Sequence, residues 1–191
     1  YEQQKKEYDD LIAAREDFEK IIADLSKQML ERFNAEFVKI QDNFREIFRE
    51  LFGGGTGKLE LEPPENGDML EAGVEIYAQP PGKLLKSMSL LSGGEKALTA
   101  IAILFSILKL RPMPFVILDE TEAALDESNV EVFARYLKKF SGNTQFIVVT
   151  HRKPTMELAD RLYGVTMQEK GVSTIVTVSL SEAVRHSSND A

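Results

Sequence analysis

Two adjacent carboxylates, Asp119 and Glu120, directly follow an apolar run at Phe115 to Leu118. The run is short and wholly apolar, which predicts a buried strand, and open α/β sheets bind their ligands at the carboxyl ends of such strands. In nucleotide hydrolases an aspartate there holds Mg²⁺, and a neighbouring group orients the attacking water. An acidic pair can also begin a helix, but ionised carboxylates at a buried strand end are costly without a cation or donors.

A second apolar strand, predicted at Phe146 to Thr150, places His151 at the same edge of the sheet. An imidazole there can donate to a γ-phosphate or order a water molecule. A lone histidine is usually structural, but this is less often so for one at the parallel position of a neighbouring strand. Asp126, which precedes a helix predicted from Asn129, is either a plain helix cap or a further carboxylate near the same pocket.

Ser92, with Glu95 three residues later, forms a capping box at the start of an apolar helix predicted through Lys109. Gly93 and Gly94 stand in its first turn, where each glycine costs about 1 kcal/mol relative to alanine. Bare backbone at this position favours an oxyanion, because the first amides and the positive end of the helix dipole attract negative charge. Taken alone, the segment could also be an ordinary capped helix.

A glycine-rich segment at residues 53–58 (Gly-Gly-Gly-Thr-Gly-Lys) has the composition of a phosphate-binding loop but not its pattern. That loop needs a glycine five residues before the Gly-Lys pair and a serine or threonine after the lysine. Phe52 and Leu59 occupy these places. The segment also follows a helix and precedes a strand, the reverse of a phosphate-binding loop. We therefore expect a helix stop and a tight turn.

Residues 1 to about 52 repeat apolar side chains at helical spacing. One helix of this length would run roughly 78 Å, whereas a compact chain of this size has a radius of gyration of about 16 Å, so part of it must project. Residues 1–30 are rich in charge, as in a coiled-coil strand, and residues 33–52 are rich in phenylalanine, as on a core. The alternative is one long, kinked surface helix. Because the pattern begins at Tyr1 without a cap, we expect a piece of a longer protein.

Buried strands that alternate with helices indicate an α/β fold with a parallel sheet covered on both faces. The expected units are an arm at residues 1–30, a lobe at 31–181 and a flexible tail at 182–191, which contains His186. Expected within the lobe are a hairpin (58–62 and 74–78), helices (92–109, 129–140 and 155–162), strands (115–118 and 145–150) and a terminal hairpin (163–168 and 172–180).

Composition excludes several classes of protein. The 191 residues include 23 basic and 31 acidic side chains and no cysteine, which excludes disulfide frameworks and thiolate sites and fits the cytoplasm. No apolar run reaches the roughly 18 residues of a membrane span, so we expect no membrane partner. A net charge of −8 argues against a generally basic, nucleic-acid-binding surface, so any contact with DNA is expected to be local. The candidates for a DNA-facing surface are Lys83, Lys86, Lys96, Arg152 and Lys153. For most of them, an ordinary solvent-exposed charged face is the commoner explanation.

Four stretches, taken in order, resemble one family. They are residues 91–98 (Leu-Ser-Gly-Gly-Glu-Lys-Ala-Leu), 118–120 (Leu-Asp-Glu), 123–126 (Ala-Ala-Leu-Asp) and 149–153 (Val-Thr-His-Arg-Lys). Together they resemble the carboxyl-terminal half of an ABC-type ATPase head, and more narrowly that of a bacterial SMC (structural maintenance of chromosomes) protein. The continuations Glu-Lys-Ala-Leu and Ala-Ala-Leu-Asp favour SMC proteins over transporters and RecN-like repair proteins. Thr121 departs from the aliphatic residue that is more frequent there.

The resemblance implies an ABC-type half-head with an amino-terminal coiled-coil stub, which hydrolyses ATP with Mg²⁺ between two heads. Ser92, Gly93 and Gly94 would form the signature motif, which contacts the γ-phosphate of ATP bound to a second SMC head. Asp126 would be the D-loop aspartate across the same interface.

The same resemblance assigns the remaining candidate residues. Asp119 would be the Walker B magnesium residue, Glu120 the general base and His151 the switch histidine. The Walker A loop would lie in the amino-terminal lobe of the same head, which would explain why residues 53–58 fail the pattern.

Further partners are implied as well. A kleisin winged-helix domain would dock on this half, with the terminal hairpin involved, and the complex would act on DNA in chromosome condensation and segregation, in the cytoplasm and on the nucleoid. Two alternatives stay open: the head lobe of another coiled-coil ABC ATPase in DNA repair, of the RecN type, and a kleisin-binding scaffold that does not hydrolyse ATP.

Overall fold

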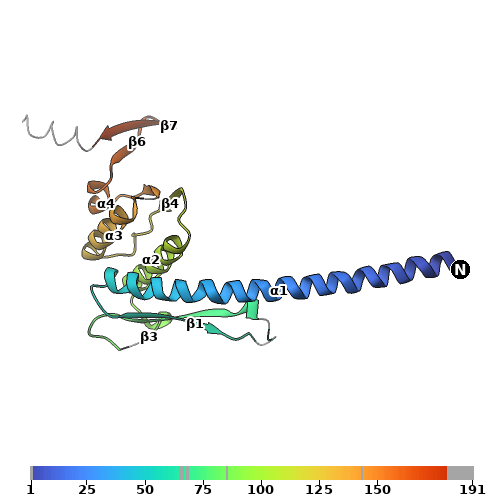
Figure 1. The fold of residues 1–191 in the computed structure, drawn as a ribbon. Helices are drawn as coiled ribbons and strands as arrows, with labels where there is room; N and C mark the ends of the chain where they lie inside the picture. Colours follow the sequence, from blue (N-terminus) through green and yellow to red (C-terminus); the bar gives the residue numbers. More distant parts are fainter. Residues whose placement is uncertain (1, 65–66, 68, 85, 143, 180–191) are drawn as a thin grey trace, which may run out of the picture.

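The computed structural model describes residues 2–179 apart from 65–66, 68, 85 and 143. Its first element, α1 (Glu2–Leu51), is a single helix of 50 residues. The helix crosses the body and projects far beyond it, with its amino-terminal end at the tip (Figure 1). Its buried residues all lie in the second half: Phe37, Phe44, Ile47, Phe48 and Leu51. The prediction that part of this helix projects is therefore confirmed.

An antiparallel sheet packs on one side of α1. It consists of β1 (Thr56–Glu62), β2 (Gly73–Gln79) and the short β3 (Lys86–Ser87), in that order. The β1–β2 pair confirms the first predicted hairpin. Two 3₁₀ turns, η1 (Met69–Glu71) and η2 (Met88–Leu90), were not predicted.

The glycines between α1 and β1 form a turn, as expected. Gly53, Gly54 and Gly55 all have positive φ angles, of 67°, 143° and 76°, a region in which L side chains are disfavoured. A Cβ on Gly55 would also lie 2.1 Å from the carbonyl oxygen of Gln79. The turn geometry therefore accounts for these glycines without a phosphate.

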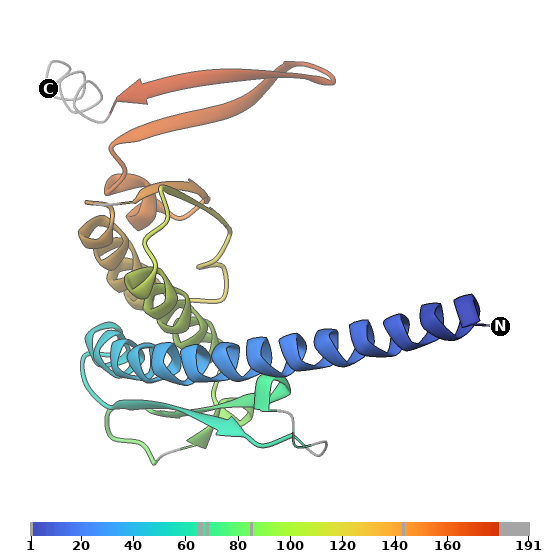
Figure 2. The same ribbon diagram turned by 45° about the vertical axis from the view of Figure 1, so that its right-hand side comes forward.

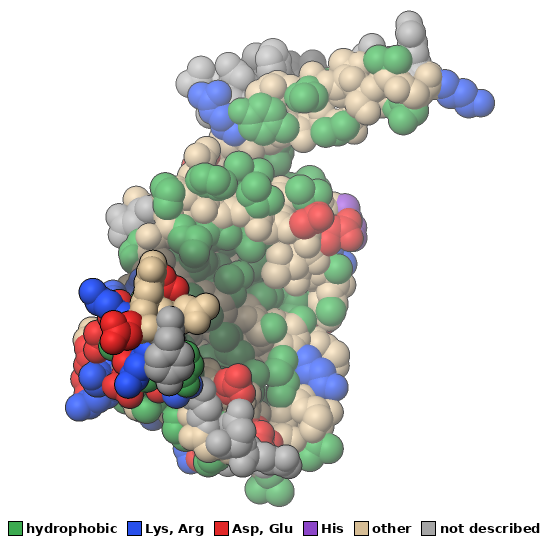
Figure 3. Space-filling model, turned by 90° about the vertical axis from the view of Figure 1, so that its right-hand side faces the viewer, with side chains coloured by type: hydrophobic (Ala, Val, Ile, Leu, Met, Phe, Trp, Pro, Cys, Tyr) green, Lys and Arg blue, Asp and Glu red, His purple; other side chains and the backbone are tan. Residues whose placement is uncertain are grey.

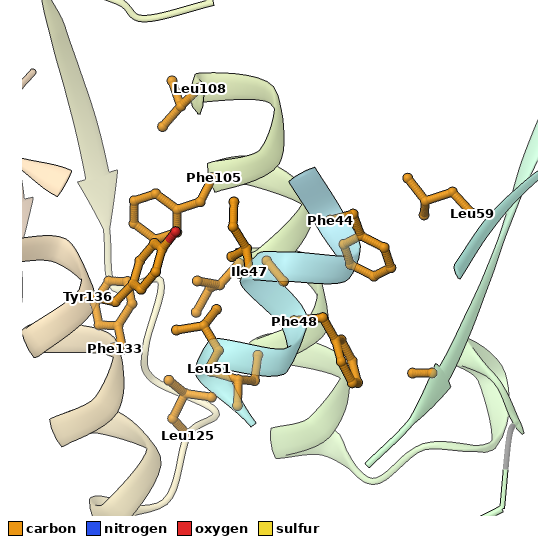
Figure 4. Packing of buried hydrophobic residues seen from close by; sticks show 14 of the residues in the cluster. Phe44, Ile47, Phe48, Leu51, Leu59, Phe105, Leu108, Leu125, Phe133 and Tyr136 are labelled. Carbon is orange, nitrogen blue, oxygen red and sulfur yellow. The ribbon is translucent and has the colours of Figure 1, made fainter. Parts of the chain in front are cut away.

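Three helices meet in the core. The second is α2 (Gly93–Leu110) and the third is α3 (Glu127–Phe140). Phe105 of α2 lies between them, with its ring centroid 4.9 Å from that of Tyr136 and 6.5 Å from that of Phe133. Ile47 and Leu51 of α1 reach the same cluster (Figure 4). The three helices therefore form one packed unit.

Strands β4 (Phe115–Asp119) and β5 (Gln145–Val149) form a parallel pair. The expectation that this sheet is covered on both faces is wrong for the described residues. The side chains of Leu118 and Val148 turn to the core, but Ile117 is 60% exposed and Val149 is 52% exposed. The apolar pattern predicts burial on both faces, but the described part of the chain covers one face only.

The last elements are α4 (Lys153–Glu157) and the antiparallel hairpin of β6 (Arg161–Glu169) and β7 (Val172–Ser179). The helix predicted at 155–162 is wrong in its bounds, because a proline at its start fixes the first turn and β6 already begins at Arg161. The predicted terminal hairpin is confirmed, and it stands away from the body (Figure 2). The expected flexible tail at 182–191, with His186, lies outside the described residues. None of the described helices is both long and apolar enough to cross a membrane.

Candidate functional site

The parallel pairing of β4 and β5 brings two of the predicted residues together. Asp119 lies opposite Val149 in the ladder, and the amide of Glu120 donates to the carbonyl oxygen of Val149 at 2.9 Å. The segments that follow the two strands therefore leave from one edge. His151 Nδ1 lies 3.5 Å from Glu120 Oε1, and both side chains are more than half exposed. We refer to Glu120 and His151 as the edge pair.

The backbone of Glu120 is strained. Its φ angle is 45°, and no other described residue except glycine has a positive φ. This conformation costs an L residue roughly 1 to 2 kcal/mol. Strain of this kind persists where the surroundings impose it, and it gathers at functional sites. Here two backbone hydrogen bonds hold the residue. The amide of Glu120 donates to the carbonyl oxygen of Val149, and the carbonyl oxygen of Glu120 accepts from the amide of Ala123 at 3.0 Å.

Ser92 caps α2 as the sequence predicts. Its hydroxyl accepts from the amide of Glu95 at 3.4 Å, and its amide donates to Glu95 Oε2 at 3.0 Å, so the capping box is confirmed. A Cβ on Gly93 would meet nothing within 4 Å, and one on Gly94 would lie 3.4 Å from the carbonyl oxygen of Ala124. Packing within the chain therefore does not require a glycine at position 93. No contact within the described chain offsets the helix stability that this glycine costs.

The start of α2 borders an open pocket of about 400 Å³. Asp126 reaches this pocket from the start of α3, where it also caps the helix by accepting from the amide of Asn129 at 2.9 Å. That hydrogen bond lowers the pKa of Asp126. Asp126 is therefore a helix cap, as the first reading had it, and it also lines the pocket at the start of α2. We call this pocket the signature pocket, after the motif that residues 92–94 resemble. Its lining residues are Phe52, Lys83, Ser92, Gly94, Glu95, Ala124, Asp126 and Asn129.

The predicted site residues thus fall into two clusters. The signature pocket contains Ser92, Gly94 and Asp126, whereas Asp119, Glu120 and His151 are absent from its lining. The alternative reading of Asp126, a carboxylate near the pocket of His151, is therefore not supported by this lining. Among the described residues, no group of three histidine, aspartate or glutamate side chains is arranged to hold a metal ion.

Sequence reasoning missed the role of Lys83 and misjudged that of Arg152. Lys83 Nζ donates to Glu95 Oε1 at 2.8 Å and lines the signature pocket, so it is tied to the capping box. The guanidinium of Arg152 is partly buried and donates to the carbonyl oxygen of Leu125. Arg152 is therefore used inside the protein, which removes it from the candidate DNA-facing surface. No local sequence signal reports either contact, because each joins segments 12 or more residues apart.

Hydrogen bonds from Lys83 and Ser92 lower the pKa of Glu95 from 4.5 to about 2. Because the folded-state value lies below the ordinary one, this carboxylate stabilises the fold fully above about pH 4.5 and progressively less as the pH falls toward 2. We expect Glu95→Gln to lower the free energy of unfolding at pH 7 by about 1 to 2 kcal/mol, since the half-exposed Lys83 is screened by solvent.

The measurement is urea unfolding at several pH values between 7 and 3. The difference between the parent protein and Glu95→Gln should shrink with falling pH. Glu127→Gln, which changes an exposed glutamate in the first turn of α3, serves as the control. A difference for Glu95→Gln that stays constant over this range would contradict the assignment.

Comparison with known proteins identifies close relatives. A family model described as the RecF/RecN/SMC N terminal domain matches residues 3–174. The chromosome partition protein Smc of Bacillus subtilis is 59% identical over 174 residues, which cover 91% of this chain and 14% of that protein. The chain therefore spans about a seventh of the length of this relative.

Similar solved structures also come from SMC proteins. A chain from a study of ATP-driven dimerization and DNA-stimulated activation of SMC ATPases is 42% identical, with a TM-score of 0.73 over 84% of this chain and 96% of that one. The Pyrococcus furiosus Smc head with an extended coiled coil, bound to the C-terminal domain of ScpA, is 41% identical. Its TM-score is 0.76, over 99% of this chain and 47% of that one. The fold is that of an SMC head domain.

Proposed function

The chain belongs to the SMC family, and from this premise we propose that it is the carboxyl-terminal lobe of an SMC ATPase head. The head would hydrolyse ATP between two heads and act in chromosome condensation and segregation, on the nucleoid in the cytoplasm. The description of the matching family model refers to an amino-terminal domain. The choice of the carboxyl-terminal lobe rests instead on the residues at the two clusters and on the failed phosphate-loop pattern at residues 53–58.

The separation of the edge pair from the signature pocket carries this proposal. A self-contained nucleotide site would gather its phosphate-binding and water-activating groups around one ligand. This chain instead presents Glu120 with His151 at one place and Ser92 with Asp126 at another. The arrangement suits a dimer in which the edge pair serves the nucleotide of its own head. The signature pocket then serves the nucleotide of the opposite head.

The donor set at the edge of β4 fits magnesium and ATP. Mg²⁺ is commonly bound by one or two carboxylates together with substrate phosphates and water, so Asp119 alone is a sufficient protein ligand from this lobe. The bound ion neutralises charge on the phosphates. Glu120, with its exposed carboxylate, would orient the attacking water. A protonated His151 can donate through Nδ1 to Glu120 and through Nε2 to a phosphate oxygen.

The uncovered face of the β4–β5 pair supports a missing lobe. Phe115 and Ile117 on β4 and Ile147 and Val149 on β5 are each 47% to 60% exposed. Strands of a parallel sheet are normally covered on both faces, so we assign this apolar sheet face to the amino-terminal lobe that carries Walker A. This chain covers only 47% of the similar P. furiosus head, which leaves room for such a lobe.

The projecting hairpin offers a second apolar surface. Tyr163, Val165 and Met167 of β6 share one face with Ile175 of β7, because Val165 pairs with Ile175 in the ladder. All four side chains are 61% to 71% exposed, and apolar groups gather on the hairpin in Figure 3. We assign this hairpin face to a kleisin winged-helix domain, in keeping with the likeness to a head bound to the C-terminal domain of ScpA.

The exposed part of α1 fits a coiled-coil arm. Apolar side chains recur there at helical spacing, and each is more than half exposed, which is expected where a partner strand covers them. They are Leu11, Phe18, Ile22, Leu25 and Met29. We therefore keep the arm at residues 1–30, the lobe at 31–181 and the tail at 182–191 as proposed units. Contact with DNA is part of the same proposal.

Of the two alternatives, a RecN-like repair protein keeps the chemistry and changes the cellular role. The high identity to a chromosome partition protein favours the SMC assignment. A scaffold that binds a kleisin without hydrolysis is distinguished only by activity.

We expect no ATP turnover by this chain alone, because no phosphate loop is recognisable in its sequence. Co-expression with the amino-terminal lobe of its parent protein should restore turnover. Glu120→Gln should then lower kcat by about 10² or more, since general-base catalysis contributes that much. The measurement is phosphate release by the chain and by the reconstituted head. Turnover by the chain alone that Glu120→Gln abolishes would contradict the proposal, and silence of a well-folded pair would favour the scaffold.

The signature motif can be tested separately. Ser92→Arg and Ser92→Ala both remove the cap of α2, at a cost of about 1 kcal/mol, but only arginine fills the space in front of Gly93 and Gly94. We expect Ser92→Arg in the reconstituted head to leave ATP binding nearly unchanged and to abolish ATP-dependent head dimerisation. Ser92→Ala should weaken dimerisation less. Nucleotide titration and analytical ultracentrifugation measure the two properties. Equal loss of both with Ser92→Arg would mean that Ser92 serves its own nucleotide.

We expect the apolar sheet face and the hairpin face to bind different partners. Ile117 on the sheet face and Ile175 on the hairpin face are 60% and 67% exposed, so lysine is tolerated at either position in the free chain. We expect Ile117→Lys to weaken association with the amino-terminal lobe at least about tenfold, because the charge would be buried. Ile175→Lys should spare that association and weaken binding of a kleisin winged-helix domain. Calorimetry with each partner measures both, and the reverse pattern would refute the assignment.

A further inference from the structure

A buried carboxylate lies in the chain between Glu120 and Asp126. Glu122, in the turn between β4 and α3, is only 1% exposed. Its Oε1 accepts from the hydroxyl of Thr150, while its buried Oε2 has no partner among the described residues. Burial of a carboxylate is costly unless it is well satisfied. A glutamate kept there at that cost requires a reason beyond packing.

Glu122 belongs to a closed ring of hydrogen bonds. The hydroxyl of Thr150, which donates to Glu122, accepts from the amide of Arg152 at 3.0 Å. The guanidinium of Arg152 donates to the carbonyl oxygen of Leu125. The amide of Leu125 donates to the carbonyl oxygen of Glu122 at 2.9 Å, which closes the ring. Glu122 and Leu125 are buried and Thr150 and Arg152 are half-buried, and we call these four residues the buried ring.

The buried ring includes both chain neighbours of His151 and begins two residues after Glu120. His151 lies between Thr150 and Arg152, so both of its neighbours in the chain are fixed. Glu120 precedes Glu122 by two residues, and its carbonyl oxygen accepts from Ala123 within the same turn. The edge pair itself has little else to order it, because its two side chains are exposed and meet only at 3.5 Å.

We propose that Glu122 and Arg152 are positioning residues for hydrolysis, which hold Glu120 and His151 in place through Thr150 and Leu125. This rests on the proposed function for the value of the edge pair, but the ring itself can be tested without ATP. A shift of about 1 Å in catalytic groups can cost about a hundredfold in rate. Loss of the ring should therefore lower the catalytic rate more than it lowers nucleotide binding.

The test uses the reconstituted head and measures kcat and KM for ATP. We expect Glu122→Ala to lower kcat at least about tenfold and to change KM less than about twofold. Glu122→Gln keeps an acceptor for Thr150 and should restore most of the activity. Glu131→Ala, which removes an exposed glutamate of α3, should have no effect. Equal activity of Glu122→Ala and the parent head, or no rescue by glutamine, would overturn the proposal.

A second pair of variants covers failure to fold. Thr150→Val removes the hydroxyl at similar volume and should lower kcat as Glu122→Ala does, whereas Thr150→Ser keeps the hydroxyl and should not. Amide hydrogen exchange on the chain alone provides a readout that needs no ATPase activity. The Arg152 amide should exchange at least about tenfold faster in Thr150→Val than in Thr150→Ser, because its acceptor is lost.

The two levels of inference fail in different ways. If the parent head has no ATPase activity, the proposed function fails, and the exchange rate of the Arg152 amide alone decides whether the ring holds the segment around His151. If the head is active and exchange at Arg152 is the same in both Thr150 variants, the ring does not hold that segment and the positioning role is excluded.

Discussion

The packing of Phe105 joins three elements that carry or lead to candidate functional residues. Its ring, on α2, contacts aromatic rings from α3 and from β5, with centroids 4.9 to 6.5 Å apart. The same helix begins at Ser92, α3 is capped by Asp126, and β5 leads to His151. Aromatic contacts of this kind are directional as well as apolar. Because one side chain packs against all of these elements, it helps to fix the position of the edge pair relative to the signature pocket.

Polar groups are divided between burial and exposure in a consistent way. Glu120 and His151, which would contact the nucleotide, are exposed. Glu122, which has no proposed contact with the nucleotide, is buried. Exposed charges hold each other weakly, so exposed reactive groups need a frame that does not depend on their own attraction. The strained φ of Glu120 indicates such a frame, because an isolated turn would relax it. The buried ring therefore provides the stabilising hydrogen bonds, and the edge pair remains accessible to a nucleotide.

Local chemistry made much of the fold predictable. The capping box at Ser92 and the acidic pair after β4 are short-range patterns, and the structure contains the elements that they predict. Long-range contacts were not accessible in the same way. The bond from Lys83 to Glu95 and the buried position of Glu122 depend on how distant segments meet. The bounds of α4 were missed for a local reason, since a proline starts that helix earlier than its apolar residues suggest.

The apolar character of β4 and β5 predicts that both faces of the pair are covered, and the described part of the chain covers only one of them. Sequence periodicity reports how much burial a strand requires, not which polypeptide supplies it. An apolar face such as that of Ile117 and Val149 is unusual on a protein that acts alone. The same holds for the phosphate loop, which the chain lacks in a recognisable form, and for Gly93, whose cost no contact within the chain offsets. Each of the three features is accounted for if a second polypeptide segment meets this chain there, as the proposed function requires.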